Sequence, residues 1–309
     1  MIEIQQLTKV YGDKTAVDDL SFTVRPGAVT GFLGPNGAGK STTMRAIVGL
    51  DHPTRGQALV EGRRYGDHPA PLCVVGALLE AGAAHPGRSA LNHLRALAAT
   101  HGIGRRRVEE VIGQVGLDEV AGKRAGGFSL GMGQRLGVAA ALLGDPAVLV
   151  LDEPVNGLDP DGIRWIRGLL RGLAAEGRTV LVSSHLMSEM SLTADHLVII
   201  GRGRLLADVS MTEMTASTTS TVRVRSPRAA DLVPLLPGPD LIVTALGPDT
   251  VSISGLSSAT IAETALAHGI VLHEVTPINV SLEDAYMALV QDHIEYQAAP
   301  YSGPGRTAA

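Results

Sequence analysis

The chain has 309 residues, of which 45% are hydrophobic, with 26 Lys and Arg against 31 Asp and Glu. This length allows about two domains, each with its own core, and the single cysteine, Cys73, excludes an internal disulfide framework. The net charge of −5 disfavours a nucleic-acid-binding protein, and no apolar run approaches the roughly 20 residues of a membrane span. The first residues lack the basic and apolar regions of a secretory signal, so we expect a protein that stays in the cytosol.

The early part of the chain alternates predicted strands and helices. Short apolar runs bounded by chain breakers occur at 29–33, 147–151 and 179–183, and such runs are typical of strands buried on both faces of a parallel sheet. Alternating patterns at 2–4 and 21–24 indicate half-buried strands. The sequence therefore predicts an α/β fold. The intervening helical patterns lie at 41–48, 89–101, 105–115, 131–143 and 162–175.

Composition then changes near residue 210. Residues 1–210 hold 22 basic and 21 acidic side chains, whereas the rest of the chain holds 4 and 10. A stretch rich in Ser and Thr at 211–220 is typical of a linker, and the small, polar residues 296–309 are typical of a disordered tail. We therefore expect one domain at 1–210, a linker at 211–220, an accessory domain at 221–295 and a tail at 296–309.

The accessory domain has its own pattern of elements. Four predicted strands and two predicted helices follow one another in the order β-α-β-β-α-β, which is compatible with a small ferredoxin-like α+β domain. The strands are expected at 221–225, 241–245, 250–254 and 270–275, the helices at 229–236 and 258–268, and a last helix at 281–292.

The most specific chemical signal is a glycine-rich loop after the strand at 29–33. It matches G-x-x-x-x-G-K-[ST] and precedes a predicted helix, which is the context that a phosphate-binding loop requires. Glycines let backbone N–H groups converge on phosphates, the Lys40 ammonium can reach the β- and γ-phosphates, and the Ser41 hydroxyl can bind Mg²⁺. A chance glycine-rich turn is the alternative, which the flanking elements disfavour. The expected nucleotide contacts here are Gly34, Pro35, Asn36, Gly37, Ala38, Gly39, Lys40, Ser41 and Thr42.

Two acids follow the apolar strand at 147–151. A carboxylate at the end of a buried strand is costly unless it binds a cation or accepts hydrogen bonds. Beside a phosphate-binding loop, Asp152 is therefore expected to hold Mg²⁺, and Glu153 is expected to polarise an attacking water as a general base. A strand that simply ends in two solvated acids is the alternative.

Together these features resemble the ATP-binding subunits of ABC transporters. Residues 128–135 are similar to the family's signature stretch, 156–159 to its D-loop and His185 to its switch histidine, while Tyr11 matches the aromatic residue that stacks on adenine. An exposed surface aromatic and a core histidine remain the alternatives for Tyr11 and His185. The resemblance covers about residues 2–208. It implies the P-loop NTPase fold of an ABC ATPase domain with a helical subdomain at about 84–143.

Two positions depart from the common pattern of the family. The signature keeps Ser129 and one glycine, Gly131, and Glu80 stands where most members have the glutamine of the Q-loop. Both variants resemble the branch that exports bacitracin and lantibiotics. The resemblance implies that Ser129, Gly131, Asp159 and Glu80 contact the nucleotide and that Glu80 also contacts Mg²⁺.

A head-to-tail dimer follows from the same resemblance, with each ATP between the phosphate-binding loop of one copy and the signature of the other. The expected cofactors are ATP and Mg²⁺. Lys40 and Mg²⁺ would balance charge, Glu153 would activate the water, and His185 would contact the γ-phosphate.

The expected function is the ATP-hydrolysing subunit of an exporter at the cytoplasmic face of the membrane. It would power efflux of an antibiotic, peptide or drug through a separate integral membrane permease, which would dock around residues 81–95 and 99–103. No nucleic acid is expected as a partner. Two alternatives stay open: a soluble ABC ATPase that is not linked to transport, and an accessory domain that senses or sequesters drug.

Overall fold

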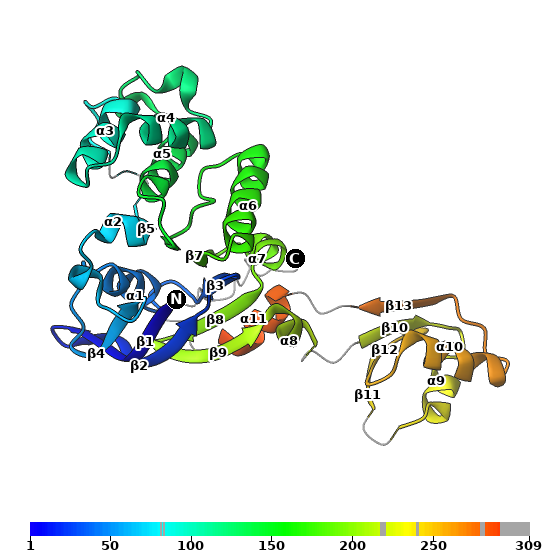
Figure 1. The fold of residues 1–309 in the computed structure, drawn as a ribbon. Coiled ribbons are helices and arrows are strands. Elements are labelled where there is room, and N and C mark those ends of the chain that lie inside the picture. Colours follow the sequence, from blue (N-terminus) through cyan, green and yellow to red (C-terminus); the bar gives the residue numbers. More distant parts are fainter. Residues whose placement is uncertain (81, 83, 217–220, 239–240, 279–281, 291–309) are drawn as a thin grey trace, which may run out of the picture. The chain divides into compact units, whose positions relative to one another are not determined.

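The chain divides into two compact units. The computed structural model describes residues 1–80, 82, 84–216, 221–238, 241–278 and 282–290. One unit comprises Met1–Val209 together with Val290, and the other comprises Ser210–Leu289 (Figure 1). Within the described ranges, every helix is too short or too polar to cross a membrane.

The first unit is built around a six-stranded sheet in the order β5-β6-β7-β3-β8-β9. Strands β5, β6, β7, β3 and β8 run parallel. Three of them, β3, β6 and β7, are buried along their whole length, as their apolar runs predict, so the α/β fold is confirmed. Because these strands are parallel, their carboxyl ends meet at one edge of the sheet. The strands are β3 (Val29–Leu33), β5 (Val75–Leu78), β6 (Val148–Leu151), β7 (Thr179–Ser183), β8 (His196–Gly201) and β9 (Arg204–Ser210).

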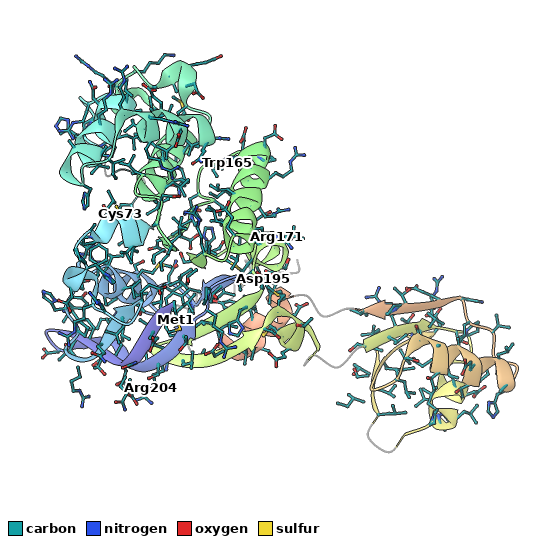
Figure 2. All side chains as sticks on the ribbon, in the orientation of Figure 1. Met1, Cys73, Trp165, Arg171, Asp195 and Arg204 are labelled. Carbon is teal, nitrogen blue, oxygen red and sulfur yellow. The ribbon has the colours of Figure 1, made fainter. Side chains whose placement is uncertain are left out.

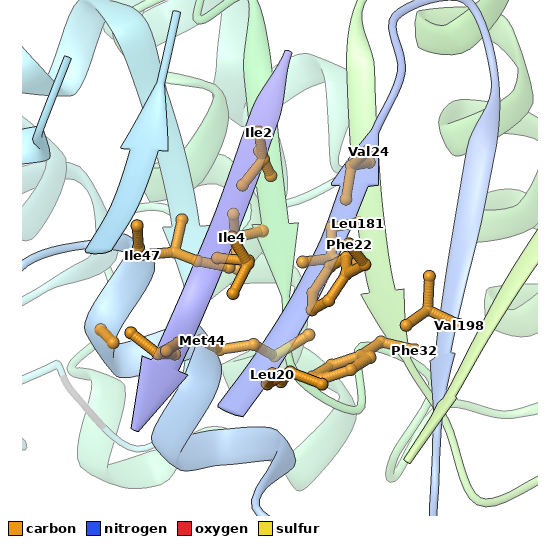
Figure 3. Packing of buried hydrophobic residues seen from close by; sticks show 14 of the residues in the cluster. Ile2, Ile4, Leu20, Phe22, Val24, Phe32, Met44, Ile47, Leu181 and Val198 are labelled. Carbon is orange, nitrogen blue, oxygen red and sulfur yellow. The ribbon is translucent and has the colours of Figure 1, made fainter. Parts of the chain in front are cut away.

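A second, antiparallel sheet packs against the first one. Its order is β2-β1-β4, with β1 at Ile2–Tyr11, β2 at Lys14–Val24 and β4 at Arg55–Val60. Apolar side chains of β1, β2 and helix α1 (Lys40–Ile47) form one core with those of the six-stranded sheet (Figure 3). Within this core, the ring centroids of Phe22 and Phe32 lie 5.4 Å apart. The expected short strands at the N-terminus are parts of β1 and β2.

A helical subdomain stands beside these sheets. It contains α3 (Ala90–Thr100), α4 (Arg105–Gln114) and α5 (Leu130–Leu142), which pack together (Figure 1). Trp165 of α6 (Pro160–Ala175) ties α6 to them, since its indole N–H donates to the carbonyl of Gln114 at 3.2 Å and the Arg135 guanidinium lies 4.5 Å from the ring centroid (Figure 2). The remaining helices of this unit are α2 (Pro71–Val74) and α7 (Met187–Thr193).

The contact between β5 and α5 depends on Gly76. A Cβ at this position would lie 2.0 Å from the carbonyl oxygen of Ala141. We expect Gly76→Ala to destabilise the first unit by about 1–3 kcal/mol, measured as a lower midpoint in chemical denaturation of the full chain. Gly168→Ala on α6 is the control, because a Cβ there meets no described atom within 4 Å and should be neutral or stabilising. Equal midpoints for Gly76→Ala and the unchanged protein would contradict the close packing.

The second unit contains a four-stranded antiparallel sheet in the order β11-β12-β10-β13. Two helices pack on one of its faces around a small apolar core that includes Val224, Ile253 and Ile261. The elements follow one another as β-α-β-β-α-β. They are β10 (Thr221–Arg225), α9 (Ala229–Leu232), β11 (Ile242–Ala245), β12 (Thr250–Ser254), α10 (Ser258–Ala267) and β13 (Glu274–Ile278), and a last helix, α11, covers Leu282–Val290.

Two boundaries in this unit differ from those expected. The helix expected at 229–236 ends at Leu232 and continues as a 3-10 turn that contains Pro234, a residue that cannot extend an α-helix. The strand expected at 270–275 begins only at Glu274. Ile270 and Leu272 pack into the apolar core ahead of the strand, which explains their strand-like pattern.

The expected linker is also partly structured. Met211–Ala216 form helix α8, and Ser210 and Glu213 hold its start. The Ser210 hydroxyl accepts from the Glu213 N–H at 3.1 Å, and the Ser210 N–H donates to the Glu213 carboxylate at 2.8 Å. This reciprocal pair of hydrogen bonds is a capping box. It starts a helix in a stretch whose Ser and Thr content favours turns. Residues 217–220 and the tail expected at 296–309 lie outside the described residues.

Cys73 is exposed, whereas its apolar neighbours predict a buried position. The run from Leu72 to Leu79 is divided between the one-turn helix α2 and strand β5. Only the strand part includes fully buried residues, so the apolar run overestimates the burial of Cys73.

Candidate functional site

A glycine-rich loop joins the carboxyl end of β3 to the N-terminus of α1. Gly37 and Gly39 have φ angles of 81° and 101°, in the left-handed region that favours glycine. A Cβ at Gly39 would also lie 2.5 Å from the carbonyl oxygen of Ala16. The loop therefore needs glycine here. Its backbone N–H groups and the helix N-terminus form a favourable site for an anion.

Lys40 is held inside this loop. Its Nζ donates to the carbonyl oxygens of Gly34 at 2.6 Å and Pro35 at 3.2 Å. Burial lowers the pKa of Lys40, while the carboxylates of Glu153 and Asp152 oppose this shift. The ammonium group is thus positioned where phosphate oxygens would replace the two carbonyl acceptors.

The loop lines a cleft of about 400 Å³. This volume lies within the range of small-molecule sites, about 300–1,000 Å³. The cleft brings together most of the loop, Tyr11 and the two acids that follow β6, as the sequence predicts. Its lining residues are Tyr11, Lys14, Ala16, Asn36, Gly37, Ala38, Gly39, Lys40, Ser41, Thr42, Asp152 and Glu153.

Asp152 connects three strands with the loop. Its carboxylate accepts from the Ser41 hydroxyl at 2.7 Å and from the hydroxyl of Ser183, and its N–H donates to the carbonyl of Leu78 at 2.7 Å. A hydroxyl and a carboxylate oxygen side by side are hard ligands of the kind that Mg²⁺ takes together with phosphates and water. The donor set at Ser41 and Asp152 therefore fits Mg²⁺.

Glu153 is fixed from three sides. Its N–H donates to the Ser183 hydroxyl at 2.9 Å, its carbonyl accepts from the Gln134 amide at 3.0 Å, and its Oε2 lies 2.7 Å from Nδ1 of His185. Its φ of 49° is unusual for a residue with a side chain. The structure thus brings Glu153 and the half-exposed His185 together.

Tyr11 stands at the end of β1, at the mouth of the cleft. Its hydroxyl donates to Asp51 at 2.8 Å, and the same carboxylate oxygen accepts from Arg45 at 2.8 Å. Burial and the bond to Asp51 both raise the pKa of Tyr11. With Lys9 Nζ 4.8 Å from its centroid, the ring is oriented by these contacts and still 46% exposed.

Ser129, Gly131 and Asp159 lie apart from this cleft. Ser129 caps α5 and Asp159 caps α6, each accepting a backbone N–H bond from the first turn, at 3.2 Å and 2.8 Å. A Cβ at Gly131 would lie 2.7 Å from the carbonyl oxygen of Gly157, so the signature and the D-loop pack closely. The described residues that line the cleft of a single chain therefore do not include Ser129, Gly131 or Asp159.

Glu80 is likewise outside the nucleotide cleft. It is exposed and lines a second cavity, of about 600 Å³, together with Arg45, His93 and Leu97. It follows β5, the edge strand, which pairs with β6. Asp152 comes directly after β6, and its N–H donates to the carbonyl of Leu78, two residues before Glu80. The contact of Glu80 with the nucleotide and Mg²⁺ stays a prediction.

Three residues of the site carry no assigned role in the sequence analysis: Gln134, Ser183 and Asp51. Ser183 could have been inferred, since it ends β7 beside β6 and ligands bind at the carboxyl ends of parallel strands. Gln134 lies in the stretch similar to the signature, but its contact with Glu153 joins segments far apart in the sequence and has no local signal. The same holds for the contact of Asp51 with Tyr11.

Comparisons with known proteins identify relatives of this chain. A family model described as ABC transporter matches residues 17–156, and a model of a domain of unknown function matches residues 220–283. An uncharacterized ABC transporter ATP-binding protein of Bacillus subtilis (strain 168), YhcH, is 36% identical over 292 residues, which cover 94% of this chain and 95% of the relative.

Two relatives with named cargo match about two thirds of this chain. The bacitracin transport ATP-binding protein BcrA of Bacillus licheniformis is 42% identical over 212 residues, 68% of this chain and 69% of the relative. The lantibiotic transport ATP-binding protein SrtF of Streptococcus pyogenes is 35% identical over 208 residues, 67% of this chain and 90% of the relative.

Solved structures match the fold of the first unit. An ATP-binding subunit of an ABC transporter has a TM-score of 0.65 and 28% identity, and covers 70% of this chain and 92% of that chain. A dimeric ATP-binding cassette in a post-hydrolysis state, bound to ADP and Pi, has a TM-score of 0.63 at 23% identity, with 68% and 99% covered, which shows the fold alone. The chain belongs to the family of ABC transporter ATP-binding proteins. Its first unit is an ABC ATPase domain with the expected P-loop NTPase fold.

Proposed function

We propose that this chain hydrolyses ATP to drive export of an antibiotic, peptide or drug through a separate membrane permease. The observation that carries the proposal is the cleft in which the phosphate-binding loop meets Lys40, Asp152 and Glu153. The identities of 42% and 35% to the bacitracin and lantibiotic transport proteins support the class of cargo. The chain would act at the cytoplasmic face of the membrane, where the permease would hold it.

Each residue has a separate role in the proposed reaction. Ser41 and Asp152 would hold Mg²⁺, which supplies charge neutralisation for the phosphate oxygens when bound. Lys40 donates to the β- and γ-phosphates, and Glu153 accepts the proton of the attacking water. His185, 2.7 Å from the Glu153 carboxylate, would orient that carboxylate and contact the γ-phosphate.

A second copy would complete the site. Ser129 and Asp159 lie at the N-termini of α5 and α6, and helix N-termini favour anions. The described residues that line the cleft of one chain do not include Ser129 or Asp159. We therefore propose that these two residues meet the ATP bound by the other copy in a head-to-tail dimer.

The second cavity is the proposed docking site of the permease. It lies between the sheets and the helical subdomain, and most of its lining is apolar, including Leu72, Leu79 and Leu136. Ala84 and His93 connect it with the expected docking segment at 81–95. A helix of the permease with apolar side chains would fit this cavity, and crosslinks from residue 84 or 97 to the permease would test it.

Tyr11 is proposed to stack on adenine. Loss of base–aromatic stacking costs about 1–3 kcal/mol, so we expect Tyr11→Ala to weaken ATP binding by about tenfold, measured by calorimetry. Tyr11→Phe keeps the ring and should stay within about twofold of the unchanged protein, despite the lost bond to Asp51. Equal affinities for Tyr11→Ala and Tyr11→Phe would contradict stacking.

The function itself is tested by co-expression with candidate permease subunits, in a host sensitive to bacitracin or a lantibiotic. We expect a higher inhibitory concentration for at least one such compound, and no increase when the chain carries Glu153→Gln. An active ATPase and a correctly inserted permease without any change in resistance or cargo efflux would overturn the proposal.

A further inference from the structure

Gln134 links the signature helix α5 to Glu153. Its side chain is buried, with 2% of its surface exposed, and its Nε2 donates to the carbonyl oxygen of Glu153 at 3.0 Å. A buried amide is tolerated only when it is hydrogen-bonded. The hydrogen-bond partner of Gln134 is therefore the backbone carbonyl of Glu153, the proposed general base.

The conformation of Glu153 explains why such a partner matters. Its φ of 49° is a strained conformation that persists only where the surroundings hold it. Ser183 binds its N–H and Gln134 binds its carbonyl, so both flanking peptide groups are fixed. The direction in which the carboxylate leaves the backbone depends on these two bonds.

The same helix begins at the signature. Ser129 caps α5 and lies about 1.4 turns before Gln134, about 7.5 Å along the axis. A helix is rigid over this length, so a displacement of its N-terminus moves Gln134 and with it the carbonyl of Glu153.

We infer that Gln134 is a positioning residue for ATP hydrolysis, which couples the signature of a chain to the general base of the same chain. The inference rests on the proposed function, in which the signature meets the ATP of the second copy. Contact with one ATP would thereby align the base that acts on the other ATP.

The first test is the kinetics of Gln134→Leu in the full chain. Leucine has a similar volume but cannot donate, so kcat should fall by at least about tenfold, while KM and the Kd for ATP stay within about twofold. Gln114→Leu, the same change at an exposed position at the end of α4, is the matched control and should have the activity of the unchanged protein. If Gln134→Leu does not fold, Gln134→Met offers an unbranched side chain of the same length.

The second test asks in which chain Gln134 acts. Chains are mixed so that the active one meets a tenfold excess of partner, and phosphate release is measured per active chain. A Gln134→Leu chain mixed with excess Glu153→Gln partner should be slow, because its own base is misplaced. In a second mixture, an unchanged chain meets excess partner that carries both Gln134→Leu and Glu153→Gln. It should release phosphate at the same rate as an unchanged chain mixed with excess Glu153→Gln partner.

The outcomes separate the inference from the proposed function. Hydrolysis by Glu153→Gln at the rate of the unchanged protein would overturn Glu153 as the general base of the proposed reaction, and with it the inference. An inactive Glu153→Gln with a fully active Gln134→Leu, or a defect that appears only in the partner's site, would overturn the role of Gln134 alone. A loss of ATP binding by Gln134→Leu would indicate a structural role and also contradict it.

Discussion

Glu153→Gln is expected to lower the ATP turnover of this protein by on the order of 100-fold or more, which is the scale of general base catalysis. Glutamine has the same shape but cannot accept the proton of the attacking water. The bonds from Ser183 and Gln134 to the backbone of Glu153 do not involve the carboxylate, so they should remain. Phosphate release at saturating ATP measures the loss of activity.

ATP binding separates this effect from damage to the fold. Because Glu153 belongs to the chemical step, the Kd for ATP of Glu153→Gln should stay within a few fold, and ATP-driven dimers should accumulate. Glu119→Gln, the same substitution at an exposed acid outside the cleft, is the control. Turnover by Glu153→Gln at the rate of the control would show that another residue is the base.

Lys40→Met is expected to weaken ATP binding by about 100-fold. A hydrogen bond to a charged group contributes about 1.5–3 kcal/mol, or about 10- to 150-fold in affinity. Lys40 already donates two bonds inside the loop that phosphate oxygens would accept instead. Calorimetric titration with ATP measures the loss, and Lys123→Met, at an exposed position, should bind normally. Unchanged affinity in Lys40→Met would exclude Lys40 as a phosphate contact.

The same lysine predicts a pH dependence. Burial lowers the pKa of Lys40 in the nucleotide-free protein, whereas nearby phosphates favour the charged ammonium and should raise that pKa. Below both pKa values the affinity should be constant, and it should weaken as the pH rises through the pKa of the free protein, with proton uptake on binding. Lys40→Met should lose this dependence.

Much of the ATPase domain could be predicted because its signals are local. The apolar runs of β3, β6 and β7 indicate buried parallel strands, and the carboxyl ends of parallel strands meet at one edge. The phosphate-binding loop and the pair Asp152 and Glu153 follow two of these strands directly. Their position at the same edge of the sheet therefore follows from the parallel direction of these strands.

The remaining features depend on contacts between distant segments, or on local signals that compete with one another. Gln134 belongs to the stretch similar to the signature, but nothing local indicates that its amide donates to the carbonyl of Glu153. The Ser- and Thr-rich stretch after Val209 has turn-forming composition, but the pair Ser210 and Glu213 starts a helix there. Glu80 follows an edge strand and lines the second cavity, and no local signal in the sequence indicates that cavity.

The central claim is that the signature of one copy closes over ATP bound in the phosphate-binding loop of the other. Crosslinking measures this directly in a Cys73→Ser, Glu153→Gln chain that carries Asn36→Cys in the loop and Leu130→Cys beside Ser129, both at exposed positions. We predict that covalent dimers form with ATP. They should not form without nucleotide, nor in chains that carry only one of the two cysteines. ATP binding without these crosslinks, or equal crosslinking with and without ATP, would contradict the account.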